Sequence, residues 1–177
     1  GWGMQGPGNT NSFLAEPDCQ VVAACDLDKN HLDAALKKIN QHYRNSDCKS
    51  YHDYRELMAR KDIDAVMLAV PDNWHALVSI KPRKTGNNVY REKPLARTIT
   101  EQQAIVKAVR KYQRIWQTGS WQRSQDRFRI AAEIVRNGLI GKITEVQVGL
   151  PSGHADFAGS KGRDAGKPPP AELDYET

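Results

Sequence analysis

The chain opens on Gly1-Trp2-Gly3-Met4-Gln5-Gly6, a G-x-G-x-x-G motif directly before a stretch that reads as a helix. In such a motif Gly1 makes a tight turn, Gly3 lets backbone amides approach a phosphate, and Gly6 lets the helix pack closely on a sheet. The helix N-terminus then offers free N–H groups and the positive end of its dipole to an anion. Because three glycines at this spacing also occur in ordinary turns, the motif needs support from elsewhere in the chain.

That support comes from Asp26. Residues 20–25 read as a buried strand, and Asp26 ends it about 20 residues after Gly6, where a dinucleotide-binding fold places the acid that binds the adenosine ribose. A first hydrophobic strand should precede the glycine motif, but the chain begins on the glycine itself. We therefore expect that strand to lie outside the sequence and the chain to be a fragment.

Length and composition predict a globular protein. A chain of 177 residues can form one domain with a core, and its 39% apolar and 27% charged content is ordinary for such a domain. No apolar run approaches the roughly 20 residues that span a bilayer, so we expect no membrane segment. The three cysteines, Cys19, Cys25 and Cys48, are odd in number and widely spaced, which favours buried reduced thiols over a disulfide or a metal site.

The positive charge is concentrated in the middle of the chain. Residues 81–142 hold 15 Lys and Arg against 4 acidic residues. A nucleic-acid surface would need these charges on one face with stacking aromatics, and only Trp116 and Trp121 are available there. Residues such as Lys107 and Arg110 instead recur at helical spacing, which predicts a solvated helix face that also suits an anionic cofactor. We expect no nucleic-acid partner.

Strands and helices alternate along the first 119 residues. Strands are expected at 21–25, 64–70, 88–91 and 115–118, with a short one ending at Tyr51. Helices are expected at 7–16, 29–43, 54–60, 75–84 and 128–137, and one more after a cap at Thr100. This alternation predicts a parallel, doubly wound sheet with right-handed crossovers.

Three segments carry separate expectations. Pro82 should kink its helix or end it early, because proline removes a hydrogen bond and clashes with the preceding turn. Residues 143–148 alternate apolar and polar side chains, which predicts a strand with one covered face. Residues 151–177 are rich in glycine and proline, and we expect a loop or crossing segment with no further domain after it.

Four stretches of this chain, in their order and spacing, are similar to one known family. They are the glycine motif, Asp26, residues 70–75 (Val-Pro-Asp-Asn-Trp-His) and Glu92-Lys93-Pro94. The chain resembles the glucose-fructose oxidoreductase and inositol 2-dehydrogenase family, often called Gfo/Idh/MocA. The resemblance covers nearly the whole chain, and Glu-Lys-Pro is its most specific part.

The resemblance implies an NAD(P)-dependent oxidoreductase, with hydride passing between C4 of the nicotinamide and a carbinol carbon of a sugar, cyclitol or related polyol. Lys93 would be the catalytic residue, which contacts the reacting hydroxyl and helps to move its proton. Pro94 often follows a cis peptide bond that aims this lysine. Glu92 would lie near the cofactor ribose or orient Lys93.

The resemblance also implies a set of cofactor-binding residues. Pro71, Asn73 and His75 would border the nicotinamide half, although a histidine in a first helical turn is as often a structural partner. Residues 117–124 would line the cofactor side of the active site. The full set is Gly1, Trp2, Gly3, Met4, Gln5, Gly6, Asp26, Val70, Pro71, Asn73, His75, Glu92, Lys93, Trp121 and Arg123, with no metal ligand among them.

NAD is the expected cofactor. No arginine directly follows Asp26, which favours NAD, while Lys29 lies close enough to leave NADP open. The alternative from another class is a non-catalytic dinucleotide sensor or regulatory module, which would keep the glycine motif and need no proton-handling residue such as Lys93.

The expected fold class is α/β: a Rossmann-like doubly wound parallel sheet lacking its first strand, with the start of an α+β open-sheet second domain. The domains would be residues 1–119, which bind the dinucleotide, and 120–177, which connect to and begin the substrate and oligomerisation domain. Because that second domain is nearly absent, we expect residues 1–177 alone to bind cofactor poorly and to turn over nothing. Arg91, where the family usually has a small residue or cysteine, is a departure.

Partners and compartment follow from the same resemblance. The intact protein is expected to act on a small sugar or polyol and to form a homo-oligomer, because the open sheet of the family commonly makes dimer or tetramer contacts. Reduced thiols favour the cytoplasm, with periplasmic export of the folded protein as the alternative.

Overall fold

A computed structural model describes residues 1–150 and 168–174 of the chain, with the side chains of residues 81–85 outside that description. The chain divides into two compact units, which are described separately. The first comprises Gly1–Gly119 with Pro170–Thr177, and the second Ser120–Pro169. The expectation of a loop over residues 151–167 lies outside the described residues.

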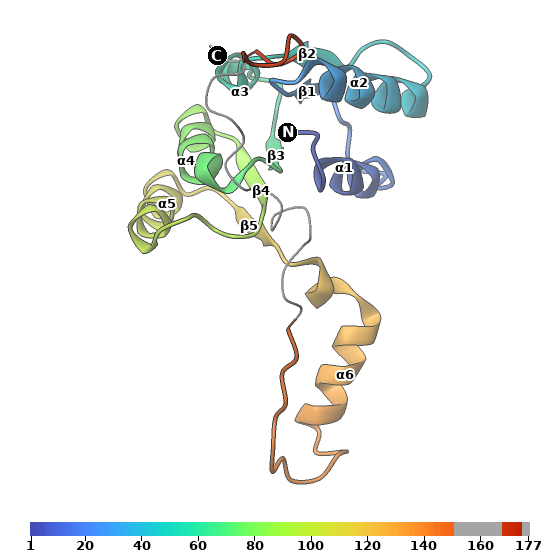
Figure 1. Ribbon diagram of the computed structural model, residues 1–177, viewed down its shortest axis with the longest axis vertical. Coiled ribbons are helices and arrows are strands. Elements are labelled where there is room, and N and C mark those ends of the chain that lie inside the picture. The colour runs from blue at the N-terminus through green and yellow to red at the C-terminus, as the bar shows by residue number, and fades with distance from the viewer. Residues whose placement is uncertain (151–167, 175–177) are drawn as a thin grey trace. The chain divides into compact units, whose positions relative to one another are not determined.

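All strands of the first unit run parallel (Figure 1). They are β1 (Ala23–Cys25), β2 (Lys49–Tyr51), β3 (Ala65–Leu68), β4 (Asn88–Glu92) and β5 (Trp116–Gly119). β1 pairs with β2, and β4 pairs with both β3 and β5. The register sets Arg91 beside Leu68 on one side and Thr118 on the other, so the turns after β3 and β4 begin at the same edge of the sheet.

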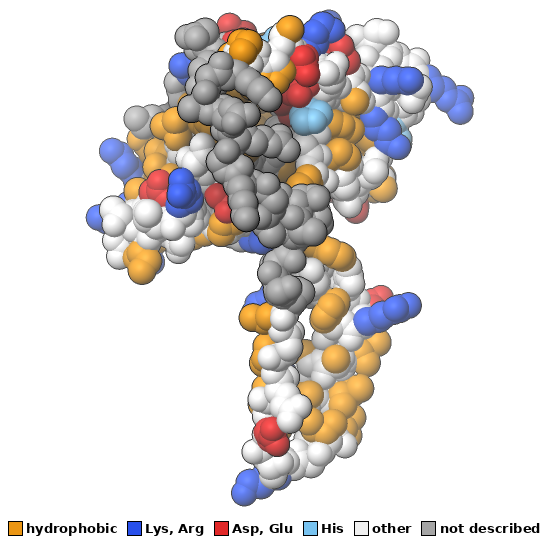
Figure 2. Space-filling view, in the orientation of Figure 1, with side chains coloured by type: hydrophobic (Ala, Val, Ile, Leu, Met, Phe, Trp, Pro, Cys, Tyr) orange, Lys and Arg blue, Asp and Glu red, His pale blue; other side chains and the backbone are white. Residues whose placement is uncertain are grey.

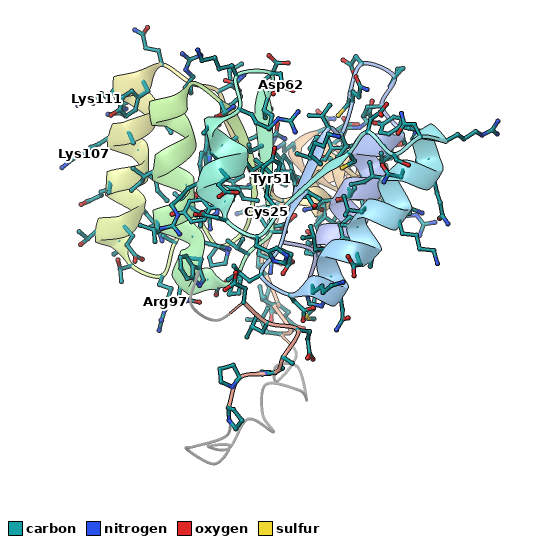
Figure 3. All side chains as sticks on the ribbon, turned by 90° about the horizontal axis from the view of Figure 1, so that it is seen from above. Cys25, Tyr51, Asp62, Arg97, Lys107 and Lys111 are labelled. Atoms are coloured by element: carbon teal, nitrogen blue, oxygen red, sulfur yellow. The ribbon has the colours of Figure 1, made fainter. Side chains whose placement is uncertain are left out.

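Helices cover both faces of these strands. They are α1 (Gly6–Leu14), α2 (Lys29–Tyr43), α3 (Tyr54–Ala59), the 3₁₀ turn η1 (Asp72–Trp74), α4 (His75–Thr85) and α5 (Ile99–Tyr112). Figure 3 shows α3, α4 and α5 on one side of the strands, and α1 and α2 on the other. The predicted α/β fold with a parallel, doubly wound arrangement is therefore confirmed.

The core lies between these layers. On one face Met58, Val66, Leu68, Val78 and Val89 form one buried cluster, which joins α3 and α4 to the central strands. A cluster on the other face joins α1, α2 and the segment before β2 through Leu14, Ile39 and Cys48. A third cluster packs α4 on α5. The apolar run of β3 is covered because helices lie on both faces, as its sequence predicts.

Side-chain caps set two of the helix starts. Asp28 accepts hydrogen bonds from the amides of Asn30 and His31, and α2 begins at Lys29, where it was predicted. The prediction that Thr100 caps α5 is wrong. Thr98 is the cap, because its hydroxyl accepts from the Glu101 amide while the Glu101 carboxylate accepts from the Thr98 amide. This reciprocal capping box places the start of α5 two residues earlier.

The expected break at Pro82 does not end α4, which continues to Thr85. A proline there costs roughly 3 kcal/mol, mainly through the lost bond to the carbonyl one turn earlier. The residues just before it are buried, Val78 at 4% exposure and Ser79 at 0%, and α4 packs on α3 and α5. This packing holds the helix until Gly86, whose φ of 103° ends it.

The second unit contains η2 (Trp121–Ser124) and α6 (Asp126–Arg136), after which Gly138 adopts a left-handed φ of 71°. Residues 143–148, predicted as a strand, have no regular structure. Ile143 is 52% exposed and Val146 75%. A strand needs a neighbour to complete its hydrogen bonds, and the described part of this unit offers none. Figure 2 shows many hydrophobic side chains on the surface of this unit.

Two remaining observations concern the whole described chain. None of its helices has the length and apolar character needed to cross a membrane. The three cysteines are free thiols, and burial raises the pKa of the Cys25 thiol to about 11.

Candidate functional site

The glycine motif forms the turn that leads into α1. A Cβ on Gly1 would lie 2.4 Å from the Ala69 carbonyl oxygen, and a Cβ on Gly6 would lie 2.3 Å from the Gly1 carbonyl oxygen. Both glycines therefore allow close packing of backbone on backbone. A Cβ on Gly3 would meet nothing within 4 Å. Gly3 thus leaves open space over the turn, where a ligand can approach the main chain.

The first turn of α1 is suited to an anion. Its N-cap residue, Gln5, makes no side-chain capping hydrogen bond to the helix amides, and Pro7 lies in the first turn. The side-chain nitrogen of Gln5, Nε2, donates instead to Asn9 Oδ1 at 3.2 Å. Main-chain N–H groups at the start of α1 are therefore left without a side-chain acceptor from the cap, as in phosphate-binding helices.

Asp26 lies against the glycine turn. It follows β1, and its Oδ2 accepts a hydrogen bond from the Trp2 amide at 2.5 Å, while its Oδ1 accepts from the Asp28 amide at 2.9 Å. A carboxylate has about four acceptor positions, so Asp26 keeps capacity for further donors. His31 Nδ1 lies 3.8 Å from Oδ1, at the outer side of the carboxylate.

The segment before the C-terminus pairs with the loop after Asp26. The Lys29 amide donates to the Glu172 carbonyl at 2.8 Å, and the Asp174 amide donates to the Leu27 carbonyl at 2.9 Å. Leu173 thereby lies opposite Asp28 in an antiparallel bridge. This contact could not be predicted from the sequence, because backbone pairing leaves no periodic pattern in so short a segment.

His75 joins the turns that follow β3 and β4. Its ring is 1% exposed, with Nε2 2.7 Å from the Val70 carbonyl oxygen and Nδ1 2.7 Å from the Pro94 carbonyl oxygen. Both ring nitrogens thus face main-chain carbonyls, which is the structural role that the sequence left open. Pro71 and Asn73 are exposed beside this bridge, and Val70 is half-buried.

Glu92 is held beneath α1. Its Oε1 accepts a hydrogen bond from Asn9 Nδ2 at 2.9 Å, and the side chain is only 5% exposed. A Cβ on Gly119 would lie 2.8 Å from the same oxygen, so a larger residue at this point would have to displace the Glu92 carboxylate. Phe13 of α1 packs edge-on against Tyr90 close by. Glu92 therefore links α1 to the end of β4.

Removal of the Asn9 amide should destabilise this link. We expect Asn9→Ala to lower the free energy of unfolding by about 1–3 kcal/mol, because the Glu92 carboxylate stays buried without its donor. Urea unfolding of the variant measures the effect. Asn11→Ala, at an exposed position of the same helix, is the matched control. Equal midpoints for the two variants would show that the Asn9–Glu92 bond contributes nothing.

Lys93 directly follows the buried Glu92 in the sequence and is itself exposed. The peptide bond between Lys93 and Pro94 is cis, as the resemblance implies. Within residues 1–150 and 168–174, the Lys93 amine has no hydrogen-bond or ion-pair partner. It is thus free to meet a ligand at the carboxyl ends of β3 and β4, where ligands bind in open parallel sheets.

The predicted residues of the first unit therefore lie in the glycine turn and at or just after the carboxyl ends of β1, β3 and β4. The glycine turn contacts Asp26 directly and packs on Ala69 and Val70 at the end of β3. His75 connects that end to the turn that carries Lys93. Trp121 and Arg123 belong to the second unit, in η2, and remain predictions as cofactor-binding residues.

These features define a dinucleotide-binding α/β unit, and comparison with known proteins identifies its family. The model for the oxidoreductase family with an NAD-binding Rossmann fold (GFO_IDH_MocA) matches residues 1–120. The chain belongs to this family.

Individual relatives agree with that assignment. Inositol 2-dehydrogenase of Salmonella typhimurium is 31% identical over 124 residues, which are 70% of this chain and 35% of that protein. A glycosyl hydrolase family 109 protein of Shewanella pealeana is 27% identical over 149 residues, which are 81% of this chain and 32% of that protein. The chain thus spans about a third of the length of these relatives.

A solved structure shows the same fold. The crystal structure of myo-inositol 2-dehydrogenase from Lactobacillus plantarum superposes with a TM-score of 0.72 at 30% identity. The match covers 81% of this chain and 41% of that one.

Proposed function

We propose that this chain is the cofactor-binding part of an NAD-dependent oxidoreductase that oxidises a carbinol of a cyclitol, sugar or related polyol. One observation carries the proposal: a glycine turn with open space at Gly3 is joined to Asp26 by the 2.5 Å bond from the Trp2 amide. In this arrangement a binding site for the pyrophosphate of the cofactor would lie next to a carboxylate that can accept hydrogen bonds from its ribose. The inositol dehydrogenase relatives suggest the substrate class.

The described residues fit such a cofactor. The amides at the start of α1 would hold the pyrophosphate, because the helix N-terminus favours an anion and Gly3 leaves its approach open. Asp26 would accept hydrogen bonds from the adenosine ribose hydroxyls. Pro71 and Asn73, exposed at the end of β3, would border the nicotinamide half.

Lys93 would carry the proton transfer. When bound, NAD⁺ supplies the acceptor for the hydride that leaves the carbinol carbon. The hydroxyl proton of the same carbinol would pass to the unprotonated amine Nζ of Lys93, so that the substrate becomes a carbonyl compound. Glu92 would not need to contact the substrate. Its carboxylate accepts a hydrogen bond from Asn9 and would hold the start of the turn that carries Lys93 in place.

Two observations favour NAD over NADP. The Asp26 carboxylate would repel a 2′-phosphate on the ribose that it binds. Lys29, the cation that could offset this repulsion, already donates to Asp33 at 2.5 Å. The charge of Lys29 is therefore partly neutralised by its neighbour on the same helix.

The ribose role of Asp26 can be tested by Asp26→Asn. We expect the affinity for NAD⁺ to fall by roughly tenfold or more, because hydrogen bonds to a charged group are worth about 1.5–3 kcal/mol. Binding of NADP⁺ should fall less or rise, since the repulsion of a 2′-phosphate is removed. Calorimetric titration of both cofactors measures this, with the exposed Asp47→Asn as the control. Unchanged NAD⁺ affinity in Asp26→Asn would argue against the ribose role.

The activity itself is tested on the full-length protein with NAD⁺ and a panel that includes myo-inositol and D-glucose. We expect NADH to form with at least one polyol. Tight NAD⁺ binding without NADH formation on any polyol would favour the sensor alternative. The glycosyl hydrolase name of one relative adds a further arm: release of nitrophenol from nitrophenyl glycosides without net NADH would assign glycoside cleavage instead.

A further inference from the structure

Arg91 is a fully buried arginine in β4, with a relative exposure of 0%. It lies on the same face of the strand as Val89, two residues earlier, which packs against Val78 of α4. Its guanidinium stands 5.9 Å from the centre of the Trp116 ring. Burial lowers the pKa of Arg91 to about 10, against the opposing effect of Asp72. An arginine in an apolar layer is costly, so its contacts should explain its presence.

Those contacts are with the turn that carries Lys93. Arg91 Nη2 donates to the Pro94 carbonyl oxygen at 2.6 Å, and Nη1 donates to the Leu95 carbonyl oxygen. Two carbonyls in succession are thus bonded by the two arms of one planar guanidinium. The third nitrogen of the guanidinium, Nε, is buried without a partner among the described residues. The hydrogen bonds that Arg91 makes are therefore directed at this turn.

His75 reaches the same carbonyl from α4. Its Nδ1 lies 2.7 Å from the Pro94 oxygen, and its Nε2 lies 2.7 Å from the Val70 oxygen. The Pro94 carbonyl oxygen therefore lies within hydrogen-bond distance of two buried side chains from different elements. A continuous set of contacts runs from the end of β3, through His75 and Arg91, to Leu95.

We propose that Arg91 is a positioning residue, which together with His75 fixes the backbone of residues 93–95 from beneath and so directs the exposed Lys93 amine. The effect of Arg91 on turnover rests on the function proposed above, whereas its effect on the backbone of the turn does not. Lysine could not replace it fully, because a single ammonium lacks the planar fork that bonds two carbonyls at once. Methionine would fill a similar volume and donate to neither.

The turn itself is examined by hydrogen exchange in the full-length protein. In Arg91→Met we expect the amides of residues 95–97 to exchange about tenfold faster, while peptides of α2 keep their wild-type rates. Arg91→Lys should show an intermediate increase, because its ammonium group supplies one donor nitrogen in place of the two that bond the carbonyls of Pro94 and Leu95. Arg110→Met, which removes an exposed arginine from α5, should change neither region.

Turnover is then measured with NAD⁺ and myo-inositol. We expect kcat in Arg91→Met to fall roughly tenfold with the Kd for NAD⁺ within about twofold of wild type, and Arg91→Lys to recover part of kcat. This separation distinguishes positioning from general support of the fold, which would weaken NAD⁺ binding as well.

The outcomes separate the two proposals. The positioning role is overturned if the amides of residues 95–97 exchange at wild-type rates in Arg91→Met. It is also overturned if the exchange rates of α2 rise as much as those of residues 95–97 and Arg91→Lys restores neither. If Arg91→Met does not fold, the exchange of Arg91→Lys decides in the same way. If the wild-type protein oxidises no polyol, the proposed function fails, and the exchange data alone still decide whether Arg91 fixes the turn.

Discussion

Lys93→Met should abolish polyol oxidation and leave NAD⁺ binding intact. We expect kcat to fall by about 10²- to 10⁴-fold, the usual contribution of a positioned acid or base. The Lys93 side chain is exposed and has no partner in the described part of the chain, so its removal should leave the free energy of unfolding nearly unchanged. A fall in kcat without a change in the free energy of unfolding would therefore show that Lys93 acts in the chemical step.

The control for this variant is Lys107→Met, which removes an equally exposed lysine from the outer face of α5 (Figure 3). Steady-state kinetics and NAD⁺ titration are compared for the two variants. Wild-type turnover in Lys93→Met would remove Lys93 from the mechanism. A parallel loss of NAD⁺ affinity would instead make it a cofactor-binding residue.

Gly6→Ala should have the second large effect, on both folding and cofactor binding. The new methyl group would lie 2.3 Å from the Gly1 carbonyl oxygen, a distance that forces the turn and α1 apart. Overpacking of this kind costs about 1–3 kcal/mol. We expect a lower unfolding midpoint in urea and NAD⁺ binding too weak to detect by calorimetry, because the amides of α1 no longer face the binding site for the pyrophosphate.

Gly3→Ala provides the contrasting variant on the same turn. Its methyl group would enter open space, so the unfolding midpoint should equal that of wild type. If the pyrophosphate lies over Gly3, the same methyl group should lower NAD⁺ affinity roughly tenfold, or about 1.4 kcal/mol. Wild-type affinity in Gly3→Ala would show that the ligand does not approach this face of the turn. A wild-type midpoint in Gly6→Ala would contradict the packing argument.

Local signals in the sequence predicted most of the first unit. Helix α2 begins at Lys29, as predicted, and the alternation of strands with amphipathic helices was enough to predict parallel strands covered on both faces. The sequence also placed Asp26 at the end of a strand, and the structure shows it there, hydrogen-bonded to the Trp2 amide of the glycine turn.

Long-range contacts account for what the sequence could not predict. The start of α5 is a local exception, because Thr98 and Glu101 form the Thr-x-x-Glu pattern of a capping box, which identifies Thr98 rather than Thr100 as the cap. Pro82 is tolerated because α4 is packed on its neighbours. The alternation over residues 143–148 predicted a strand, but alternation alone supplies no pairing partner.

Arg91 illustrates the same limit within the site. In the sequence it is a charged residue in an apolar strand, with no explanation in its neighbours. The structure shows that it donates to carbonyls three and four residues further on, across a turn whose shape the sequence does not specify.

Calorimetric titration of NAD⁺ into the full-length protein tests the central claim most directly, because the roles proposed for Asp26, the glycine turn and Lys93 in catalysis depend on the cofactor lying across that turn and Asp26. We predict one NAD⁺ bound per chain, and tighter binding of NAD⁺ than of NADP⁺. A folded protein that binds neither cofactor would contradict the account, since the glycine motif would then be a structural turn and Lys93 an ordinary surface residue.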